Sequence, residues 1–428
     1  MAGVPPGKPL TPGLDFSNHV YSDTARKSEA DVMRAYDIIT RKLPDLSQLN
    51  ALISVSLGGQ PPVFIDARSE GPSATLLEKT EDTPDAQLTI RPEYIALFYE
   101  GQLEPRYGLF KDAFFHETSM PKGNISVAIK FADLLTPNPP TPVTKYTPEA
   151  FPRLPEPTED IEQVKRDIKE FGFGLVKNAL TLEQVAIIKK AVAEQAAGEM
   201  QAGVGKTDGG PTQPNQRVWV LTNKGDEFLD LLDHPLIDEM VPWLLGDLAH
   251  VHSYFANIAR PENTPMQLHT DQVPIQPPMR DVTFGMNIMW FLADVTEKNG
   301  GTRVYPGSHR GNVAPEDIFD VSGSVAASGP AGTALVFESR LWHATGPNRD
   351  TVERPAVLMF FMRSFVRQQE NNGLSLRKEV APKLSDRHKR FMGFYTMGAL
   401  GGIDGEVREG IYVERKDDCV GRVRVPVT

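Results

Sequence analysis

The spacing of apolar residues changes along this chain and predicts two folded parts. From Glu29 to Leu43, apolar residues recur at three- and four-residue steps, which indicates one amphipathic helix that Pro44 is expected to end. Short apolar runs bounded by turn residues then predict strands at 52–57, 63–66, 74–77 and 87–90. Helical spacing returns at 92–99 and 125–135. Residues 25–135 are therefore expected to form a small α+β domain.

Proline dominates the stretch that follows this domain. Eight prolines lie between Thr136 and Asp160, a composition that excludes a stable helix and predicts a semi-rigid extended spacer. We therefore place a linker at residues 136–157 and a second domain at 158–428. The Gly/Pro-rich residues 1–24 are expected to form a flexible arm.

The second domain opens with helical patterns and continues as short strands. Helices are predicted at 158–170 and 181–200, and Thr181 with Gln184 forms a capping box at the start of the latter. Residues 201–216 are polar and Gly-rich and predict a loop. Strands are predicted at 171–176, 218–221, 250–259, 267–271, 285–292, 302–305, 333–337 and 356–365. Helices before a run of short strands favour an antiparallel sandwich or jelly roll flanked by helices.

Composition narrows the class of protein. The 428 residues carry a formal net charge of -11, which argues against general binding to nucleic acid. The single cysteine, Cys419, excludes an intramolecular disulfide and a Cys-rich metal site. No signal peptide, no apolar run of membrane-spanning length and no C-terminal Ser-Lys-Leu is present in the sequence. We expect a cytoplasmic protein whose partner is a small molecule.

A metal site is suggested by His269-Thr270-Asp271, because residues two apart on a strand face the same way. Chance explains this pair easily, and a solvated strand pair is the alternative. His343 lies 74 positions on, before a turn and an apolar strand that begins near Arg354. A hairpin there would bring Arg354 beside His343. Two imidazoles and one carboxylate leave three open positions, as in non-haem Fe(II) oxygenases, and a guanidinium can hold a carboxylate.

Three segments of the second domain resemble the phytanoyl-CoA dioxygenase family of Fe(II)- and 2-oxoglutarate-dependent oxygenases. They are Gln267–Gln272, Phe291–His309 with its Asn299-Gly300-Gly301-Thr302-Arg303, and Trp342–Asn348. The resemblance runs over about 160–400 and implies a double-stranded β-helix (jelly-roll or cupin-like) core. It implies that His269, Asp271 and His343 bind iron and that Arg354 binds the far carboxylate of 2-oxoglutarate, with O2 as second cosubstrate. Thr345 and Thr302 are candidate hydroxyl partners of 2-oxoglutarate.

The first domain, over roughly 28–135, resembles the sterol-carrier-protein lipid-binding fold. Phe64-Ile65-Asp66, the segment 84–90 and the segment 97–105 carry the likeness, whereas 120–125 departs from the family's turn. Apolar residues that could line a lipid cavity are Phe110, Phe114, Phe115, Ile125, Val127 and Phe131. Core packing explains the same pattern, so a scaffold or homodimer contact is as good an interpretation.

The resemblance implies oxidation of a small, apolar organic substrate, such as a secondary metabolite, with succinate and CO2 as coproducts. Hydroxylation, desaturation and rearrangement all remain open, whereas the Asp271 carboxylate disfavours halogenation. One alternative is a lipid carrier with an inactive oxygenase-like domain. Another is a hydrolase or lyase that uses the same three ligands, which would leave Arg354 without a task.

For several further residues the sequence allows two interpretations. His250 and His252 share one strand face and could form a second metal pair, although a structural role is favoured; His309 is expected to fix a turn. Arg217 either reaches the site or forms a surface salt bridge. Candidates for shielding the site from water are Phe284, Trp290, Trp342, Phe360 and loop 201–216.

Overall fold

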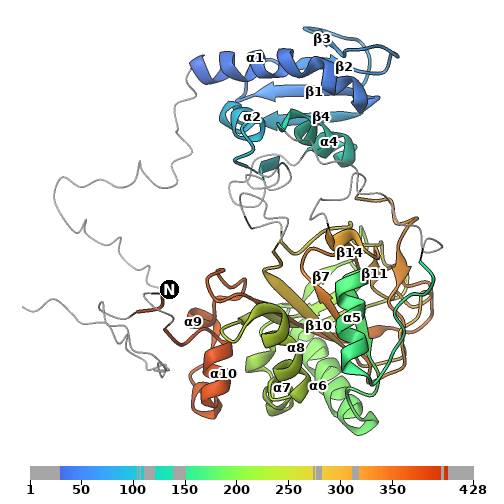
Figure 1. Cartoon of the computed structure of the whole chain (residues 1–428), viewed down its shortest axis with the longest axis vertical. Coiled ribbons are helices and arrows are strands. Elements are labelled where there is room, and N and C mark those ends of the chain that lie inside the picture. The colour runs from blue at the N-terminus through green and yellow to red at the C-terminus, as the bar shows by residue number, and fades with distance from the viewer. Residues whose placement is uncertain are drawn as a thin grey trace, which may run out of the picture. The chain divides into compact units, whose positions relative to one another are not determined.

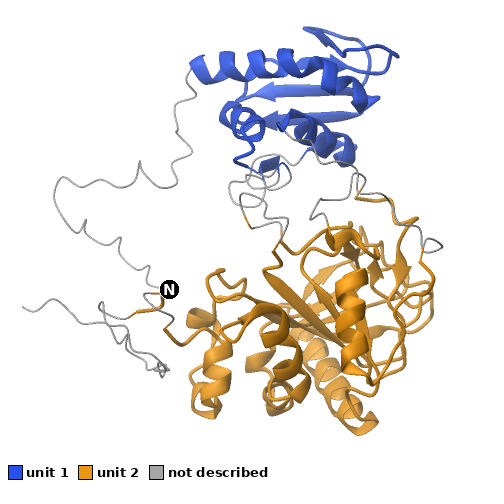
Figure 2. Ribbon diagram, viewed as in Figure 1, with its two compact units in different colours: residues 1–141 blue, residues 142–428 orange. Residues whose placement is uncertain are grey.

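The computed structural model describes residues 29–103, 105, 108–109, 121–137, 151–272, 275, 282–310, 318–396 and 400–402. These residues belong to two compact units, 1–141 and 142–428 (Figure 2). The predicted arm, most of the predicted linker, and Phe110, Phe114 and Phe115 lie outside the described residues. Within the described part of the chain, no helix combines the length and apolar character needed to cross a bilayer.

Unit 1 is a five-stranded sheet with three described helices (Figure 1). Its elements are α1 (Glu29–Leu46), β1 (Leu52–Leu57), β2 (Val63–Asp66), β3 (Thr75–Leu77), β4 (Ala86–Ile90), α2 (Pro92–Tyr99), β5 (Lys122–Gly123) and α4 (Ile125–Leu135). The strand order is β3-β2-β1-β4-β5, and only β1 and β4 run parallel. Ala86, Leu88 and Ile90 are buried while Gln87 and Thr89 are exposed, so β4 buries one face.

The prediction that Pro44 ends the first helix is wrong by two residues. Helix α1 continues through Pro44 to Leu46, which is fully buried. Pro44 lies in the last turn, where its missing N–H removes one hydrogen bond and no further turn has to be built beyond it. Burial of Leu46 compensates for this loss.

Unit 2 contains the remaining elements. Its described helices of four or more residues are α5 (Ile161–Phe171), α6 (Leu182–Gln201), α7 (Asp226–Leu232), α8 (Pro235–Leu245), α9 (Asn372–Ser375) and α10 (Asp386–Phe391). Its described strands are β6 (Phe173–Val176), β7 (Lys206–Asp208), β8 (Asn215–Val218), β9 (His250–Ala259), β10 (Gly285–Phe291), β11 (Arg303–Val304), β12 (Val325–Ala326), β13 (Ala334–Glu338), β14 (His343–Ala344) and β15 (Arg354–Met362).

Two antiparallel sheets form the core of unit 2. The larger has the order β6-β13-β10-β15-β9-β8-β7 and the smaller the order β12-β11-β14. Trp290, Val357 and Ala256 are neighbours across β10, β15 and β9 and share a hydrophobic cluster with helices α6 to α8. The neighbouring residues Phe291 and Ala356 point to the opposite face of the larger sheet and pack with Val304 of the smaller sheet. The larger sheet therefore has one face toward helices and one toward the smaller sheet.

Three sequence predictions for strands need correction. Residues 267–271 form one isolated bridge, between His269 and His343, and no strand. The predicted loop 201–216 contains β7 and the start of β8, which pair as a hairpin. This hairpin is the polar edge of the larger sheet, so it lacks the apolar alternation that marks a buried strand. Finally, Arg354 and His343 belong to different sheets, and no hairpin joins them.

The predicted capping box is confirmed and gives a test of local stability. The Thr181 hydroxyl accepts from the Gln184 N–H, and the Gln184 side chain accepts from the Thr181 N–H at 2.9 Å. Replacing Thr181 with Ala is expected to lower the free energy of unfolding by about 1 kcal/mol. The Gln184 N–H then loses its acceptor, and the Gln184 side chain is no longer held in place for the N–H of residue 181. Denaturant unfolding of Thr181→Ala beside Thr181→Ser measures this. Equal losses in both variants would show that the hydroxyl is irrelevant.

Candidate metal centre

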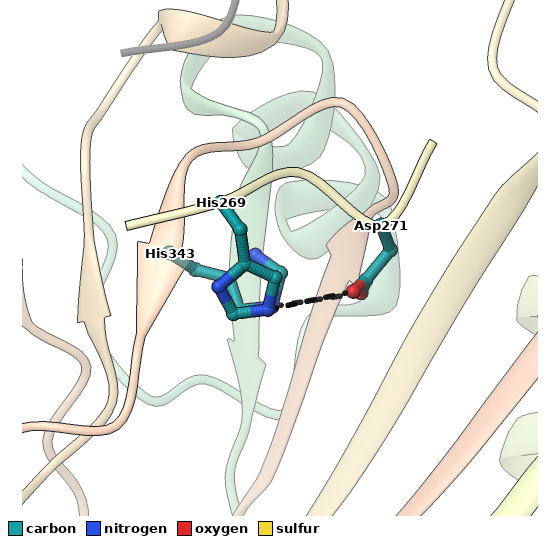
Figure 3. Close-up of side chains that lie close together, drawn as sticks. All are labelled: His269, Asp271 and His343. Carbon is teal, nitrogen blue, oxygen red and sulfur yellow. Dashed lines mark ion pairs between the residues drawn. The ribbon is translucent and has the colours of Figure 1, made fainter. Parts of the chain in front are cut away.

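The two histidines of the predicted triad are held together by the backbone. The His269 N–H donates to the His343 carbonyl and the His343 N–H to the His269 carbonyl, both at 3.0 Å. His343 belongs to β14, which pairs with β11, so the smaller sheet fixes one side of this contact. Segments 74 residues apart in the sequence thus lie side by side (Figure 3).

Both imidazoles present the same nitrogen to a common space. Nδ1 of His269 lies 2.9 Å from the Gln267 carbonyl, and Nδ1 of His343 lies 3.0 Å from the Leu341 carbonyl. Because a carbonyl only accepts, each Nδ1 carries the hydrogen and each Nε2 keeps its lone pair. The rings lie 4.3 Å apart between centroids.

Asp271 completes the group. Its Oδ1 lies 3.7 Å from Nε2 of His269 and its Oδ2 lies 3.5 Å from Nε2 of His343 (Figure 3). The three candidate ligand atoms all lie within 4.8 Å of one another. The sequence predicted that His269 and Asp271 share one face of a strand, but no strand forms there. A turn at Asp271 brings the carboxylate to the imidazoles instead. Two neutral imidazoles and one carboxylate suit a divalent transition metal.

Electrostatics favour the metal-binding form of His269. Burial and, to a smaller extent, the neighbouring His343 lower the pKa of His269 to about 4 against the opposing effect of Asp271. His269 is therefore a neutral imidazole at physiological pH, the form that coordinates a metal.

Arg354 is a buried cation with unused donors. Its side chain is 0% exposed at the start of β15, and its Nη2 donates to the Gly300 carbonyl at 2.6 Å. Within the described residues, Nε and Nη1 have no hydrogen-bond partner. Burial lowers the pKa of Arg354 to about 10, with Arg217 adding to the shift, so the group stays charged. A buried charge without a counter-ion is costly, and a carboxylate would relieve it. The donor set therefore fits 2-oxoglutarate.

The two threonines lie between the sheets. Thr302 precedes Arg303 and Thr345 follows Ala344, and Arg303 and Ala344 are paired across β11 and β14. The Thr345 hydroxyl is 3.4 Å from Nδ2 of Asn257, and the Thr302 hydroxyl is 3.3 Å from the Met289 sulfur. Both are buried. Their hydrogen bonding to 2-oxoglutarate stays a prediction.

A close backbone approach links the Thr345 loop to the Arg354 acceptor. A Cβ atom added at Gly346 would lie 2.3 Å from the Gly301 carbonyl oxygen. Only glycine fits there, so the loop after His343 packs directly on the Gly300-Gly301 segment that receives the Arg354 hydrogen bond.

Sequence reasoning missed two asparagines of this region. Asn287 on β10 donates to Oδ2 of Asp271 at 2.7 Å, and Asn257 on β9 approaches Thr345. Both are buried polar residues of strands, and in β10 (GMNIMWF) Asn287 stands in an otherwise apolar run, whereas β9 (HVHSYFANIA) has other polar residues. That contrast was the available signal, because a buried amide requires a partner.

The other histidines and the arginine singled out from the sequence have different surroundings. His250 and His252 are both buried, and no third ligand joins them among the described residues. His309 bonds the Lys169 carbonyl at 3.1 Å, in keeping with a structural role. Arg217 pairs with Asp208 and also lies 5.5 Å above the Phe255 ring.

The four aromatic candidates for a shield separate into three places. Trp290 lies on the helix-covered face of the larger sheet, so its predicted place in the shield is wrong. Trp342 packs with Leu268 and Tyr305. Phe284 and Phe360 share a separate cluster with Met362. Phe284, Phe360 and Trp342 remain candidates for contact with substrate.

Comparison with known proteins agrees with this geometry. Residues 168–356 match the family described as phytanoyl-CoA dioxygenase (PhyH). The chain is 28% identical over 256 residues to the dioxygenase af480 of Aspergillus fumigatus, which covers 56% of this chain and 79% of that relative. It is 24% identical over 220 residues to a probable alpha-ketoglutarate-dependent hypophosphite dioxygenase of Stutzerimonas stutzeri, which covers 46% of this chain and 76% of the relative.

A solved structure with a related title is the non-heme alpha ketoglutarate dependent carbocyclase SnoK from nogalamycin biosynthesis. It matches with a TM-score of 0.42 and 21% identity, over 54% of this chain and 94% of that one.

The family match, the dioxygenase relatives and the converging ligand set show that the chain is a dioxygenase of the Fe(II)- and 2-oxoglutarate-dependent class. The matched segment begins in α5 and ends in β15, so it includes the triad and Arg354. Unit 1 lies outside it, and its sterol-carrier resemblance gains no support from these comparisons.

Proposed function

We propose that the chain oxidises a small, largely apolar organic molecule at the His269, Asp271 and His343 centre, with 2-oxoglutarate held by Arg354. Succinate and CO2 would be the coproducts. The observation that carries this proposal is the buried guanidinium of Arg354, whose Nε and Nη1 have no partner among the described residues, in the same layer between two sheets as the triad. A hydrolase or a lyase would have no use for that charge.

The proposed site residues have different roles in the reaction. The three proposed ligands would hold the metal, and Arg354 would orient the cosubstrate through its far carboxylate, as a bidentate donor can. With 2-oxoglutarate and O2, a bound iron would supply the oxidising power needed to break an unactivated C–H bond. His343 is buried, whereas His269 and Asp271 are half-buried. Binding of the substrate would therefore have to complete the exclusion of water that protects the protein and the substrate from side reactions.

An apolar cluster beside the ligands supports an apolar substrate. Phe360 pairs with Asn287 across β15 and β10, and Asn287 contacts Asp271. Phe360 packs with Phe284 and Met362, and the ring of Phe284 lies 5.6 Å from that of Phe365. Phe365 is 57% exposed, which is unusual for a large aromatic side chain. We infer that this cluster receives the apolar body of the substrate.

His252 adds one polar group to this cluster. Its ring lies 4.9 Å from that of Phe360, and its Nδ1 has no partner among the described residues. A hydroxyl or carbonyl of the substrate is the expected partner. Such a molecule fits a secondary metabolite, and hydroxylation, desaturation and rearrangement are all compatible with it.

We also propose the finer structural assignments. The two sheets of unit 2 would be the halves of a double-stranded β-helix, and unit 1 would be a sterol-carrier-like domain that binds lipid or mediates dimerisation. The five-stranded sheet with a single buried face in β4 supports a domain of that size and class.

The experiment that tests the proposed function uses the purified full chain without oxygen. Adding Fe(II) and then 2-oxoglutarate is expected to produce a weak visible charge-transfer band. Admitting O2 is then expected to release succinate slowly without substrate. Bound Fe(II) with neither signal would overturn the proposal and favour a lipid carrier or a hydrolase. Arg354→Met, compared under the same conditions, should retain Fe(II) and lose the band.

A further inference from the structure

We propose that Asn287 is a positioning residue that reserves one oxygen of Asp271 and so makes this carboxylate a single-oxygen ligand. The inference rests on the proposed function, because it concerns how the same triad presents itself to a metal. It assigns to Asn287 a task that it performs through Asp271.

The geometry around Asp271 is asymmetric. Nδ2 of Asn287 donates to Oδ2 at 2.7 Å, a short distance for an amide on a carboxylate. Both oxygens face an imidazole, Oδ1 lying 3.7 Å from Nε2 of His269 and Oδ2 lying 3.5 Å from Nε2 of His343, but Oδ1 accepts no hydrogen bond from a described residue. The two oxygens, chemically equivalent in a free aspartate, thus have different surroundings. Oδ1 is the oxygen left for the ion.

Asn287 is well placed to impose this difference. It is 3% exposed in the middle of β10, where it pairs with Phe337 on one side and Phe360 on the other. Neither ring offers a competing hydrogen-bond acceptor, so the amide is directed to Asp271. Strand pairing on both sides fixes its backbone.

Asp271 itself lacks such support. It lies outside any strand, and its backbone is tied by one hydrogen bond, from its N–H to the Ser339 carbonyl at 2.9 Å. Rotation of its carboxylate would therefore be poorly restrained without Asn287. A ligand orientation that depends on an outer hydrogen bond is a common feature of metal sites.

The number of open positions gives this restraint a purpose. Three protein ligands leave three of six positions, and a chelating cosubstrate with O2 uses all three. A carboxylate that bound through both oxygens would occupy one more position than the reaction can give up. The Asn287 hydrogen bond would prevent that mode by holding Oδ2.

The test measures metal binding and not turnover. Co(II) alone is titrated into apoprotein of the wild type, of Asn287→Leu and of Asn287→Asp, and the visible Co(II) bands report both affinity and coordination. Leu keeps the size without the amide, and Asp keeps the shape without the donor. The matched control is Asn372→Leu, another buried asparagine, whose Nδ2 has no partner among the described residues.

Both Asn287 variants are expected to bind Co(II) about 10- to 100-fold more weakly and with altered bands, while the control stays within about twofold of the wild type. A thermal melt of each apoprotein identifies a misfolded variant, and Asn287→Asp then serves alone. Affinity and bands like those of the wild type in either folded variant would overturn the inference. Failure of the wild type to give the 2-oxoglutarate band while it binds Co(II) would instead overturn the proposed function.

Discussion

His343→Ala is expected to abolish turnover and to weaken Fe(II) binding by more than about 100-fold, since removing a direct ligand costs more than the 10- to 100-fold loss typical of an outer-shell change. The imidazole of His343 is one of the three proposed ligands, and its Nε2 has no replacement nearby in the described residues. The backbone pairing of His269 with His343 does not involve the side chain, so the fold should persist. Calorimetric or spectroscopic titration with Fe(II) measures the effect.

A buried histidine outside the triad gives the control for this prediction. In His309→Gln, the new amide can still donate to the Lys169 carbonyl that His309 contacts. We expect His309→Gln to bind Fe(II) like the wild type, even if its melting temperature falls. Comparable losses in both variants would mean that His343 is structural, and the triad assignment would fail.

Arg354→Met is expected to lower 2-oxoglutarate affinity by about 30- to 5,000-fold while Fe(II) affinity stays unchanged. Truncating one partner of a buried charge pair costs about 2–5 kcal/mol, which converts to that range. The apoprotein should melt at no lower temperature, because the variant replaces a buried charge, without a counter-ion among the described residues, by an apolar chain of similar length. The rise in melting temperature on adding 2-oxoglutarate should disappear.

Arg363→Met separates this effect from the general loss of an arginine. Arg363 donates to the carbonyls of Thr283, Leu244 and Leu245, so its removal leaves three acceptors without a partner. We expect the opposite result: a less stable apoprotein with undisturbed 2-oxoglutarate binding. If Arg354→Met weakened Fe(II) and 2-oxoglutarate binding equally, Arg354 would be a structural residue.

The elements that bury both faces were the most predictable from sequence. The strands β9, β10 and β15 are buried along almost their whole length, so they stand out as continuous apolar runs. Their predicted bounds differ from the observed ones by at most three residues. The start of α6 was equally clear, because Thr181 and Gln184 mark it chemically.

Elements that depend on distant partners were not predictable in the same way. The pair β7 and β8 is polar because it forms a sheet edge, and β11 and β14 have only two residues each. Such short elements exist because another strand lies beside them, and local sequence carries no trace of that strand. The bridge at His269 belongs to the same class.

The candidate site shows the same division. Composition and spacing singled out the His269 and Asp271 pair, and the resemblance joined His343 and Arg354 to it. Nothing local could reveal that Asn287 lies against Asp271, because the register of β10 decides it. The predicted hairpin between His343 and Arg354 is absent, since Arg354 belongs to the sheet opposite β14, and the role of Arg354 stays a prediction.

The reciprocal backbone bonds between His269 and His343 have a consequence for the lifetime of the protein. The two segments are distant in sequence and are joined there by an isolated bridge, without a continuous strand. Separation of His269 from His343 is therefore the expected first step of any partial unfolding. A ligand that binds only the closed form adds RT ln(1 + [L]/Kd), or about 2.7 kcal/mol at one hundred times its dissociation constant. An ion bound by both segments would therefore stabilise the closed form. We expect the rate of proteolysis to fall as the concentration of the metal ion rises.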